Sequence, residues 1–189
     1  MILPIIAYGD PILRKHAQEI GKSYPNLNEL VNNMFETMYA APGVGLAAPQ
    51  VGLSVRLIVI DGTAFMDAET DTKDVKRVFI NPKITEEEGE EWLFNEGCLS
   101  FPGLREDVMR KPNVRIEYYD ENFEFHDERF DGVMARIVQH EYDHLEGKVF
   151  VDRINPLKKT LLKRRLADIS KGDVEVSYKM KFPQKKKNK

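Results

Sequence analysis

A histidine pair with a glutamate beside it is the first feature of this 189-residue sequence that could do chemistry. The segment His140-Glu141-Tyr142-Asp143-His144 places two imidazoles four residues apart, and such residues lie on the same face of a helix. Two imidazoles at that spacing can bind one metal ion, and the glutamate can reach water on that ion. The segment therefore predicts a metal centre carried by a helix.

A catalytic centre of this kind needs a third protein ligand and leaves one position open. No histidine follows His144, and the later acidic residues sit in no recognisable ligand motif. The upstream candidates are Cys98, His16 and His126. Cys98 is the strongest because a deprotonated thiol binds such metals well, whereas His126 lies in an alternating acidic strand that is typical of a surface.

Two other classes of protein could carry these residues. A metallopeptidase that cuts internal peptide bonds uses the same helical motif, but its third ligand normally follows the helix, and none is present here. A binding protein with a purely structural metal site would need a fourth protein ligand, and the sequence offers no evident one. Both alternatives remain open on the residues alone.

Three segments taken together resemble the peptide deformylase family. They are residues 43–50 (GVGLAAPQ), 96–100 (EGCLS) and 139–144 (QHEYDH), in the family's order and with similar spacing. The resemblance spans about residues 43–147, with a weaker similarity near the N-terminus. It implies a metal-dependent hydrolase that removes the N-formyl group from the formyl-methionine of newly synthesised proteins and releases formate.

The resemblance implies a role for each matching residue. The metal ligands would be Cys98, His140 and His144. Glu141 would be the general base and later the general acid, while the Gln50 side chain and the Leu99 backbone N–H would stabilise the oxyanion. The residues expected to contact substrate are Val44, Gly45, Glu96, Gly97, Arg105, Val133 and Ile137, with the methionine side chain in an apolar pocket and the peptide backbone beside the two glycines.

Two residues depart from the family pattern. Phe101 stands where many relatives carry a smaller isoleucine or valine, and Arg136 occupies a position that is often apolar. Both are expected to reshape the substrate pocket. The metal and catalytic positions show no departure.

The ligand set also predicts the metal. A thiolate donates charge and makes the ion a weaker Lewis acid than three imidazoles would, which favours iron(II). The resemblance implies the same metal, with zinc, nickel or cobalt as substitutes. Thiolate-bound iron(II) is prone to oxidation, and a lone cysteine forms no intrachain disulfide, so the sequence indicates a reducing cytoplasm.

The elements that position these residues follow from periodicity. Helices are predicted over 26–40, over 132–147 with Asp131 as N-cap, and over 155–172 with Asn155 as N-cap and an apolar face from Leu157 to Ile169. Strands are predicted at 55–60, 77–84, 90–94, 114–119 and 123–130, with a brief strand at 174–178 and a polar loop at 67–74.

Short linkers between the strands favour antiparallel neighbours. The sequence therefore predicts an α+β fold in which antiparallel strands pack around the central metal-binding helix, with a further helix at the C-terminal end. The length fits a single catalytic domain over residues 1–172. A basic extension over 173–189 would follow, and its end from Pro183 is expected to be disordered.

Composition and charge limit the classes of partner that the protein is expected to bind. Apolar residues make up 42% and charged residues 31%, which is typical of a globular protein, and no apolar stretch approaches the roughly 20 residues of a membrane span. The net charge of −3 predicts no general affinity for nucleic acid. A local exception is the basic set Lys158, Lys159, Lys163, Arg164 and Lys185–Lys187, which is either a solvated helix face with a free tail or a transient contact with ribosomal RNA.

Overall fold

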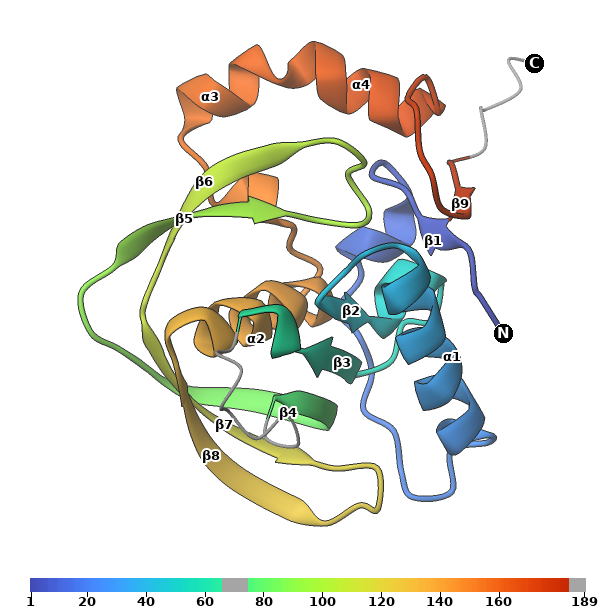
Figure 1. Cartoon of the computed structure of the whole chain (residues 1–189), viewed down its shortest axis with the longest axis vertical. Coiled ribbons are helices and arrows are strands. Elements are labelled where there is room, and N and C mark those ends of the chain that lie inside the picture. Colours follow the sequence, from blue (N-terminus) through green and yellow to red (C-terminus); the bar gives the residue numbers. More distant parts are fainter. Residues whose placement is uncertain (66–74, 184–189) are drawn as a thin grey trace.

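The structure is a computed structural model that describes residues 1–65 and 75–183. Its main sheet is antiparallel, with the order β2 (Gly45–Ala47), β3 (Leu57–Asp61), β4 (Lys76–Glu88), β7 (Asn113–Tyr119) and β8 (Phe125–Asp131). The helix α2 (Gly132–Leu145) lies between this sheet and a separate hairpin formed by β5 (Trp92–Gly97) and β6 (Arg105–Arg110) (Figure 1). The predicted α+β class is confirmed.

The sequence of strand β3 contains a continuous apolar run because both faces of the strand are buried. Ile58 and Ile60 pack in one core cluster with residues of α2. Leu57 and Val59 belong to a second cluster that includes the inner face of α1 (Leu27–Ala40). A strand buried on both faces needs no polar alternation. The helix predicted over 26–40 and the strand predicted over 55–60 are both confirmed to within a few residues.

Helix α2 is buried on nearly all sides, and its buried residues include Arg136, Gln139, His140, Glu141, Asp143 and His144. Polar side chains in such a position must find partners within the protein or bind a ligand. Asp131 is the N-cap residue, as predicted, although its side chain makes no capping hydrogen bond. Gly147 follows the helix with φ 66, the left-handed conformation that glycine tolerates best.

The single C-terminal helix predicted over 155–172 is two helices. The structure breaks it at Leu162 into α3 (Pro156–Leu161) and α4 (Lys163–Lys171). Asn155 caps α3 as predicted, since its side chain accepts a hydrogen bond from the Leu157 N–H. The predicted apolar face is wrong in its first half, because Leu157 and Leu161 are 71% and 77% exposed.

Four of the described strands differ from expectation, and two of them, β1 (Ile5–Ile6) and β2, lie where no strand was predicted. Strand β6 was also not predicted, because its sequence REDVMR is mostly charged and buries only Val108 and Arg110. The brief strand expected at 174–178 lies instead at β9 (Met180–Lys181), where it pairs in parallel with β1 (Ile5–Ile6). The other predicted strands appear with shifted ends.

The predicted loop at 67–74 and the tail from residue 184 lie outside the described residues. In the part of the chain that is described, no helix has both the length and the apolarity required to span a membrane.

Candidate metal centre and active site

Three side chains from distant parts of the sequence meet at the centre of the molecule. His140 and His144 lie one turn apart on α2, and Cys98 follows directly after strand β5. Their ligand atoms all lie within 4.8 Å of one another, and the Cys98 Sγ is 3.3 Å from the His144 Nε2. The other two candidate ligands lie elsewhere, with His16 beside Glu146 and His126 beside Asp120.

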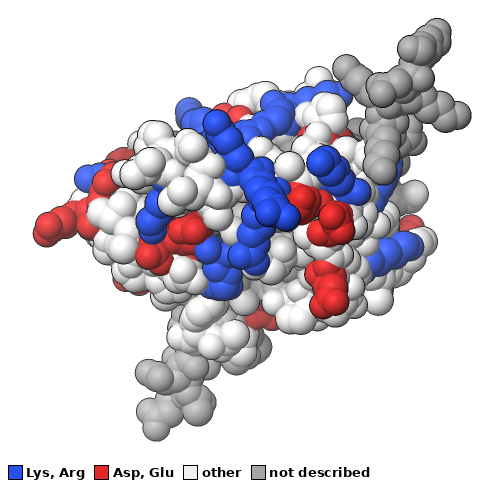
Figure 2. All heavy atoms as spheres, turned by 90° about the horizontal axis from the view of Figure 1, so that it is seen from above, with Lys and Arg blue, Asp and Glu red and all other residues white. Residues whose placement is uncertain are grey.

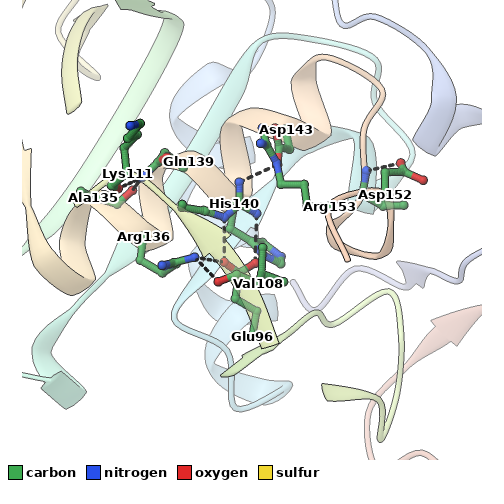
Figure 3. Close-up of polar contacts among 12 residues, drawn as sticks. Glu96, Val108, Lys111, Ala135, Arg136, Gln139, His140, Asp143, Asp152 and Arg153 are labelled. Carbon is green, nitrogen blue, oxygen red and sulfur yellow. Dashed lines mark hydrogen bonds and ion pairs between the residues drawn. The ribbon is translucent and has the colours of Figure 1, made fainter. Parts of the chain in front are cut away.

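Glu96 orients the first of these imidazoles. One of its carboxylate oxygens accepts a hydrogen bond from the His140 Nδ1 at 2.8 Å, which leaves the Nε2 available to a metal (Figure 3). The Arg110 guanidinium donates to both carboxylate oxygens, at 2.7 and 3.0 Å. Burial alone would raise the pKa of Glu96, but the hydrogen bonds from His140 and Arg110 outweigh it and hold that pKa well below its usual range.

Arg110 links Glu96, the partner of His140, to Asp143 on the same helix as that histidine. Its side chain is fully buried and bridges Glu96 to Asp143, which it contacts at 2.7 Å. Asp143 also accepts hydrogen bonds from Arg153 (Figure 3). The aspartate inside the histidine motif therefore serves as an anchor for the arginine that holds Glu96.

Glu141 is buried beside the imidazole pair, and its Oε2 has no hydrogen-bond partner among the described residues. Burial is the main cause that raises the pKa of this carboxyl to about 7. Room for the side chain comes from Gly45, because a Cβ at that position would lie 2.4 Å from the Glu141 Oε1. A carboxyl with a pKa near neutrality can both accept and return a proton.

His144, like Glu141, has a buried polar atom that makes no hydrogen bond within the described structure. Its Nδ1 is buried and has no partner in the described residues. Burial, followed by the nearby His140, lowers the pKa of His144 to about 3, so the ring is neutral, as a metal ligand must be. The pKa of His140 is raised, since hydrogen bonds to Cys98 and Glu96 outweigh the opposite effect of burial.

These residues fit a transition metal. One sulfur and two imidazole nitrogens form a donor set suited to iron or zinc. The described residues offer no fourth ligand in this cluster, which leaves a coordination position for water or substrate. The unpartnered Glu141 Oε2 belongs to the residue next to the predicted ligand His140 and lines the same cavity.

Gln50 faces the same cluster in a fixed orientation. Its Oε1 accepts a hydrogen bond from the Ala47 N–H at 2.8 Å, so the Nε2 must point the other way. The Nε2 lies 3.5 Å from the Cys98 Sγ and 3.4 Å from the Ser100 Oγ. Close by, the Leu99 N–H has no acceptor among the described residues. The Gln50 Nε2 is thus turned toward the predicted metal ligand Cys98, and the Leu99 N–H is a donor without a protein acceptor in the described part of the chain.

A cavity of about 460 Å³ opens onto these groups. Every residue predicted to contact substrate lines it: Val44, Gly45, Glu96, Gly97, Arg105, Val133 and Ile137. The predicted catalytic residues Gln50, Leu99 and Glu141 line it as well, together with Cys98 and His140. The structure therefore brings the predicted substrate and catalytic positions to one place.

Phe101 and Arg136, the two residues that depart from the family pattern, both line the cavity but make different kinds of contact. Phe101 is buried, and its ring packs against Tyr8 and Phe150. The guanidinium of Arg136 stacks 4.8 Å from the centre of the Trp92 ring and donates to Glu96 at 3.0 Å. Arg136 therefore connects α2 to strand β5 of the hairpin as well as lining the cavity.

The sequence missed several cavity residues. Phe65, Phe94, Leu104 and Tyr178 also line the cavity. Phe94 could have been found from its place two residues before Glu96 on the same strand, since such residues share a face. Tyr178 has no local signal, because it reaches the site from the far end of the chain.

Comparisons with known proteins agree with this geometry. The family described as Polypeptide deformylase matches residues 2–160. A peptide deformylase of Christiangramia forsetii is 59% identical, with 99% of each chain covered, and one of Flavobacterium johnsoniae is 57% identical with the same coverage. A crystal structure of Plasmodium falciparum peptide deformylase superposes with a TM-score of 0.80 at 39% identity, covering 89% of this chain and 95% of that one. The chain belongs to the polypeptide deformylase family, and it is a metal-dependent hydrolase that removes the N-formyl group from the formyl-methionine of newly synthesised proteins.

Proposed function

We propose that deformylation takes place in the cavity beside α2, with Cys98, His140 and His144 as the metal ligands. The observation that carries this proposal is the meeting of the three ligand atoms within 4.8 Å, next to a buried glutamate that has an unpartnered oxygen. All of these groups lie in the catalytic domain that we assign to residues 1–172.

Glu141 is the proton carrier in this proposal. A divalent ion held by the three ligands would polarise the formyl carbonyl and lower the pKa of water from 15.7 toward about 7. Glu141 takes the proton of the attacking water and then passes it to the departing amine nitrogen, after which formate leaves. Its buried carboxyl, with a pKa of about 7, suits both transfers near neutral pH.

Gln50 and Leu99 stabilise the negative charge that develops on the formyl oxygen. The Gln50 Nε2 is held in place by the bond between the Gln50 Oε1 and the Ala47 N–H, so it does not have to reorganise during the reaction. The Leu99 N–H supplies a second donor. Removing one such donor typically costs about 2.7–4 kcal/mol of transition-state stabilisation.

The substrate lies between two strand edges. In the described part of the chain, strand β2 is at the edge of the main sheet and β5 pairs only with β6, so each has an edge that an extended peptide could join. Gly45 and Gly97 lie on these strands and line the cavity. The methionine side chain enters the apolar wall formed by Val44, Val133 and Ile137, while Arg105 contacts the chain farther along.

The test of this proposal is Glu141→Gln. The variant keeps the shape of the side chain but cannot accept a proton, so we expect an unchanged metal content and a loss of nearly all turnover on formyl-Met peptides. Unformylated peptides serve as the control substrate. Substantial residual deformylation by the variant would contradict the assigned role of Glu141.

We propose iron(II) as the native metal, with zinc, nickel or cobalt as substitutes. The support is the thiolate ligand, which weakens the Lewis acidity of the ion and favours a metal that changes its coordination easily. The test is anaerobic reconstitution of the apoprotein with each metal. Zinc that matched or exceeded iron in activity would contradict the assignment. An oxidation-prone iron site also supports a reducing cytoplasm, which cell fractionation can check.

We further propose a transient contact with the ribosome through the α3–α4 surface. Lys158, Lys163 and Arg164 are exposed on these helices, and Figure 2 shows basic side chains gathered over this face. Lys158 and Lys159 already pair with acidic side chains, at 3.5 Å from Glu106 and 2.8 Å from Asp152, which reduces their availability for a phosphate. Salt-sensitive co-sedimentation with ribosomes that is lost in Lys163→Glu/Arg164→Glu would support the contact, and unchanged sedimentation would overturn it.

A further inference from the structure

The residues after α4 turn back to the active site. Gly172 ends the helix with φ 79, and a Cβ there would lie 3.1 Å from the Phe182 ring, so that ring packs directly on the turn. Val174 packs against the core cluster that also contacts Cys98. In Figure 1 this segment descends from α4 to β9, beside β1. The segment 173–183 is therefore held against the body of the protein along its length.

Backbone hydrogen bonds fix the end of this segment. The Ile5 N–H donates to the Lys179 carbonyl and the Ala7 N–H donates to the Lys181 carbonyl, each at 2.9 Å. These bonds form the parallel β1–β9 pair. They anchor the chain directly after Tyr178, because Lys179 is the next residue, and so limit the directions that the Tyr178 side chain can take.

The Tyr178 side chain reaches the active-site loop, which we define as residues 98–100, directly after β5. Its hydroxyl donates a hydrogen bond to the Leu99 carbonyl at 2.8 Å, and the half-buried side chain lines the substrate cavity. Leu99 is the residue whose N–H we assign to the oxyanion. The C-terminal segment thus contacts the same residue that supplies a proposed catalytic donor.

All three backbone carbonyls of the active-site loop accept a hydrogen bond. The Cys98 carbonyl accepts the Phe101 N–H at 2.8 Å, the Leu99 carbonyl accepts Tyr178, and the Ser100 carbonyl accepts the Tyr8 N–H at 2.9 Å. Peptide groups are planar, and the Leu99 N–H lies in the plane of the Cys98 carbonyl. Fixing the peptide planes on both sides of the Leu99 Cα therefore fixes the direction of its N–H.

We propose that Tyr178 is a positioning residue that aims the Leu99 N–H at the developing oxyanion, which makes residues 173–183 part of the active site. The proposal rests on the assigned role of Leu99. It gives the segment beyond the catalytic domain a function that requires neither its charge nor the ribosome.

The direct test is Tyr178→Phe, which removes the hydroxyl and keeps the ring. Loss of one hydrogen bond that orients a catalytic donor should lower kcat about 3- to 10-fold, with KM within about 2-fold of the wild type. Metal content should not change. Hydrogen exchange in peptides that cover Leu99 to Phe101 should become faster. The matched control is Tyr119→Phe, in the β7–β8 hairpin, where the ring packs on Phe123 and Phe125.

Each outcome has one meaning. Faster exchange in the loop together with a lower kcat supports the proposal. Unchanged exchange overturns the positioning role and leaves the role of Leu99 intact. Faster exchange with an unchanged kcat overturns the role of Leu99, and the proposal fails with it. A raised KM with an unchanged kcat assigns Tyr178 to substrate binding and overturns the positioning role.

Two truncations provide an independent check. A chain that ends at Pro183 keeps the β1–β9 pair and Tyr178, so it should retain wild-type kcat. A chain that ends at Gly172 loses both, and its kcat should fall at least as far as that of Tyr178→Phe. Equal activity of the two truncated chains would overturn the proposal. Because trimming at Gly172 alters the active site, charge reversal on α4 is the cleaner test of ribosome contact.

Discussion

At the scale of single residues, the site depends on charges that are buried together. Arg110 is fully buried between the carboxylates of Glu96 and Asp143, and each of these is also bonded to a neighbouring side chain. Ionised groups are kept in an interior only when they are paired and hydrogen-bonded. The histidine that Glu96 orients therefore depends on an arginine that does not line the cavity.

Arg110→Met should show this dependence. The change leaves two buried carboxylates without their shared partner, and breaking a buried ion pair from one side typically costs about 3–5 kcal/mol. Urea unfolding measures the loss. The control is Arg115→Met, because Arg115 pairs with Glu86 and Asp127 at the surface, where solvent screening leaves such pairs with little effect on stability. Equal losses in the two variants would contradict this account.

Gly45→Ala tests the space that Glu141 occupies. A Cβ at this position would meet the Glu141 carboxylate at 2.4 Å and displace it. Misplacing a reacting group by about 1 Å can cost on the order of 100-fold in rate, so kcat should fall by that order while the fold persists. Gly21→Ala is the control, since nothing lies within 4 Å of its added atom. A kcat near that of the wild type would mean that Glu141 has room to move.

At the scale of elements, one side chain fastens the β5–β6 hairpin to α2. Arg136 donates to the carbonyl oxygens of Trp92 at 2.7 Å and of Val108 at 2.9 Å, as well as to Glu96. Among residues 1–65 and 75–183, the hairpin shares no strand pairing with the main sheet. Arg136 thus supplies fixed contacts for a strand that the substrate is proposed to join.

Arg136→Met should loosen the hairpin. The variant keeps most of the side-chain volume but removes the donor to the buried Val108 carbonyl, at a cost of about 1–3 kcal/mol for a buried group left unpaired, and the donor to the partly buried Trp92 carbonyl. We expect faster hydrogen exchange across β5 and β6 and a higher KM, with exchange in β3 unchanged as the internal control. Unaltered exchange in the hairpin would contradict the fastening role.

The elements also separate what the sequence could predict from what it could not. The spacing of His140 and His144 predicted their common face, because helical periodicity is local. Strand β6 escaped prediction because its inward positions carry Val108 and Arg110, and an arginine does not signal a buried strand. Tyr178 escaped because its position depends on pairing between the two ends of the chain, which leaves no pattern in either end alone.

At the scale of the whole molecule, Asp152 joins the beginning of the chain to its C-terminal helices. It pairs with Arg14 near the N-terminus and with Lys159 on α3. Partial burial would raise the pKa of Asp152, but hydrogen bonds from Arg14, Lys159 and the Val149 N–H outweigh it and lower the pKa to about 2. Ionised Asp152 therefore stabilises the folded state.

The sign of the pH dependence follows from this lowered pKa. The stabilisation is fully present above about pH 4, where the carboxyl is ionised even in the unfolded chain, and it is lost as the pH falls toward about 2. Asp152→Asn should be less stable than the wild type at pH 6, by on the order of 1 kcal/mol after solvent screening, and equally stable near pH 2. Unfolding free energies measured across this range test it. A difference that persisted at pH 2 would point to lost packing instead.

The parallel pairing of β1 with β9 joins Ile5 to Met180, so it forms only after the chain between them has been synthesised. That intervening chain includes the cysteine and the histidine helix. A growing copy of this enzyme therefore holds its proposed metal ligands before it holds Tyr178, and the proposed support of its oxyanion donor is acquired after them.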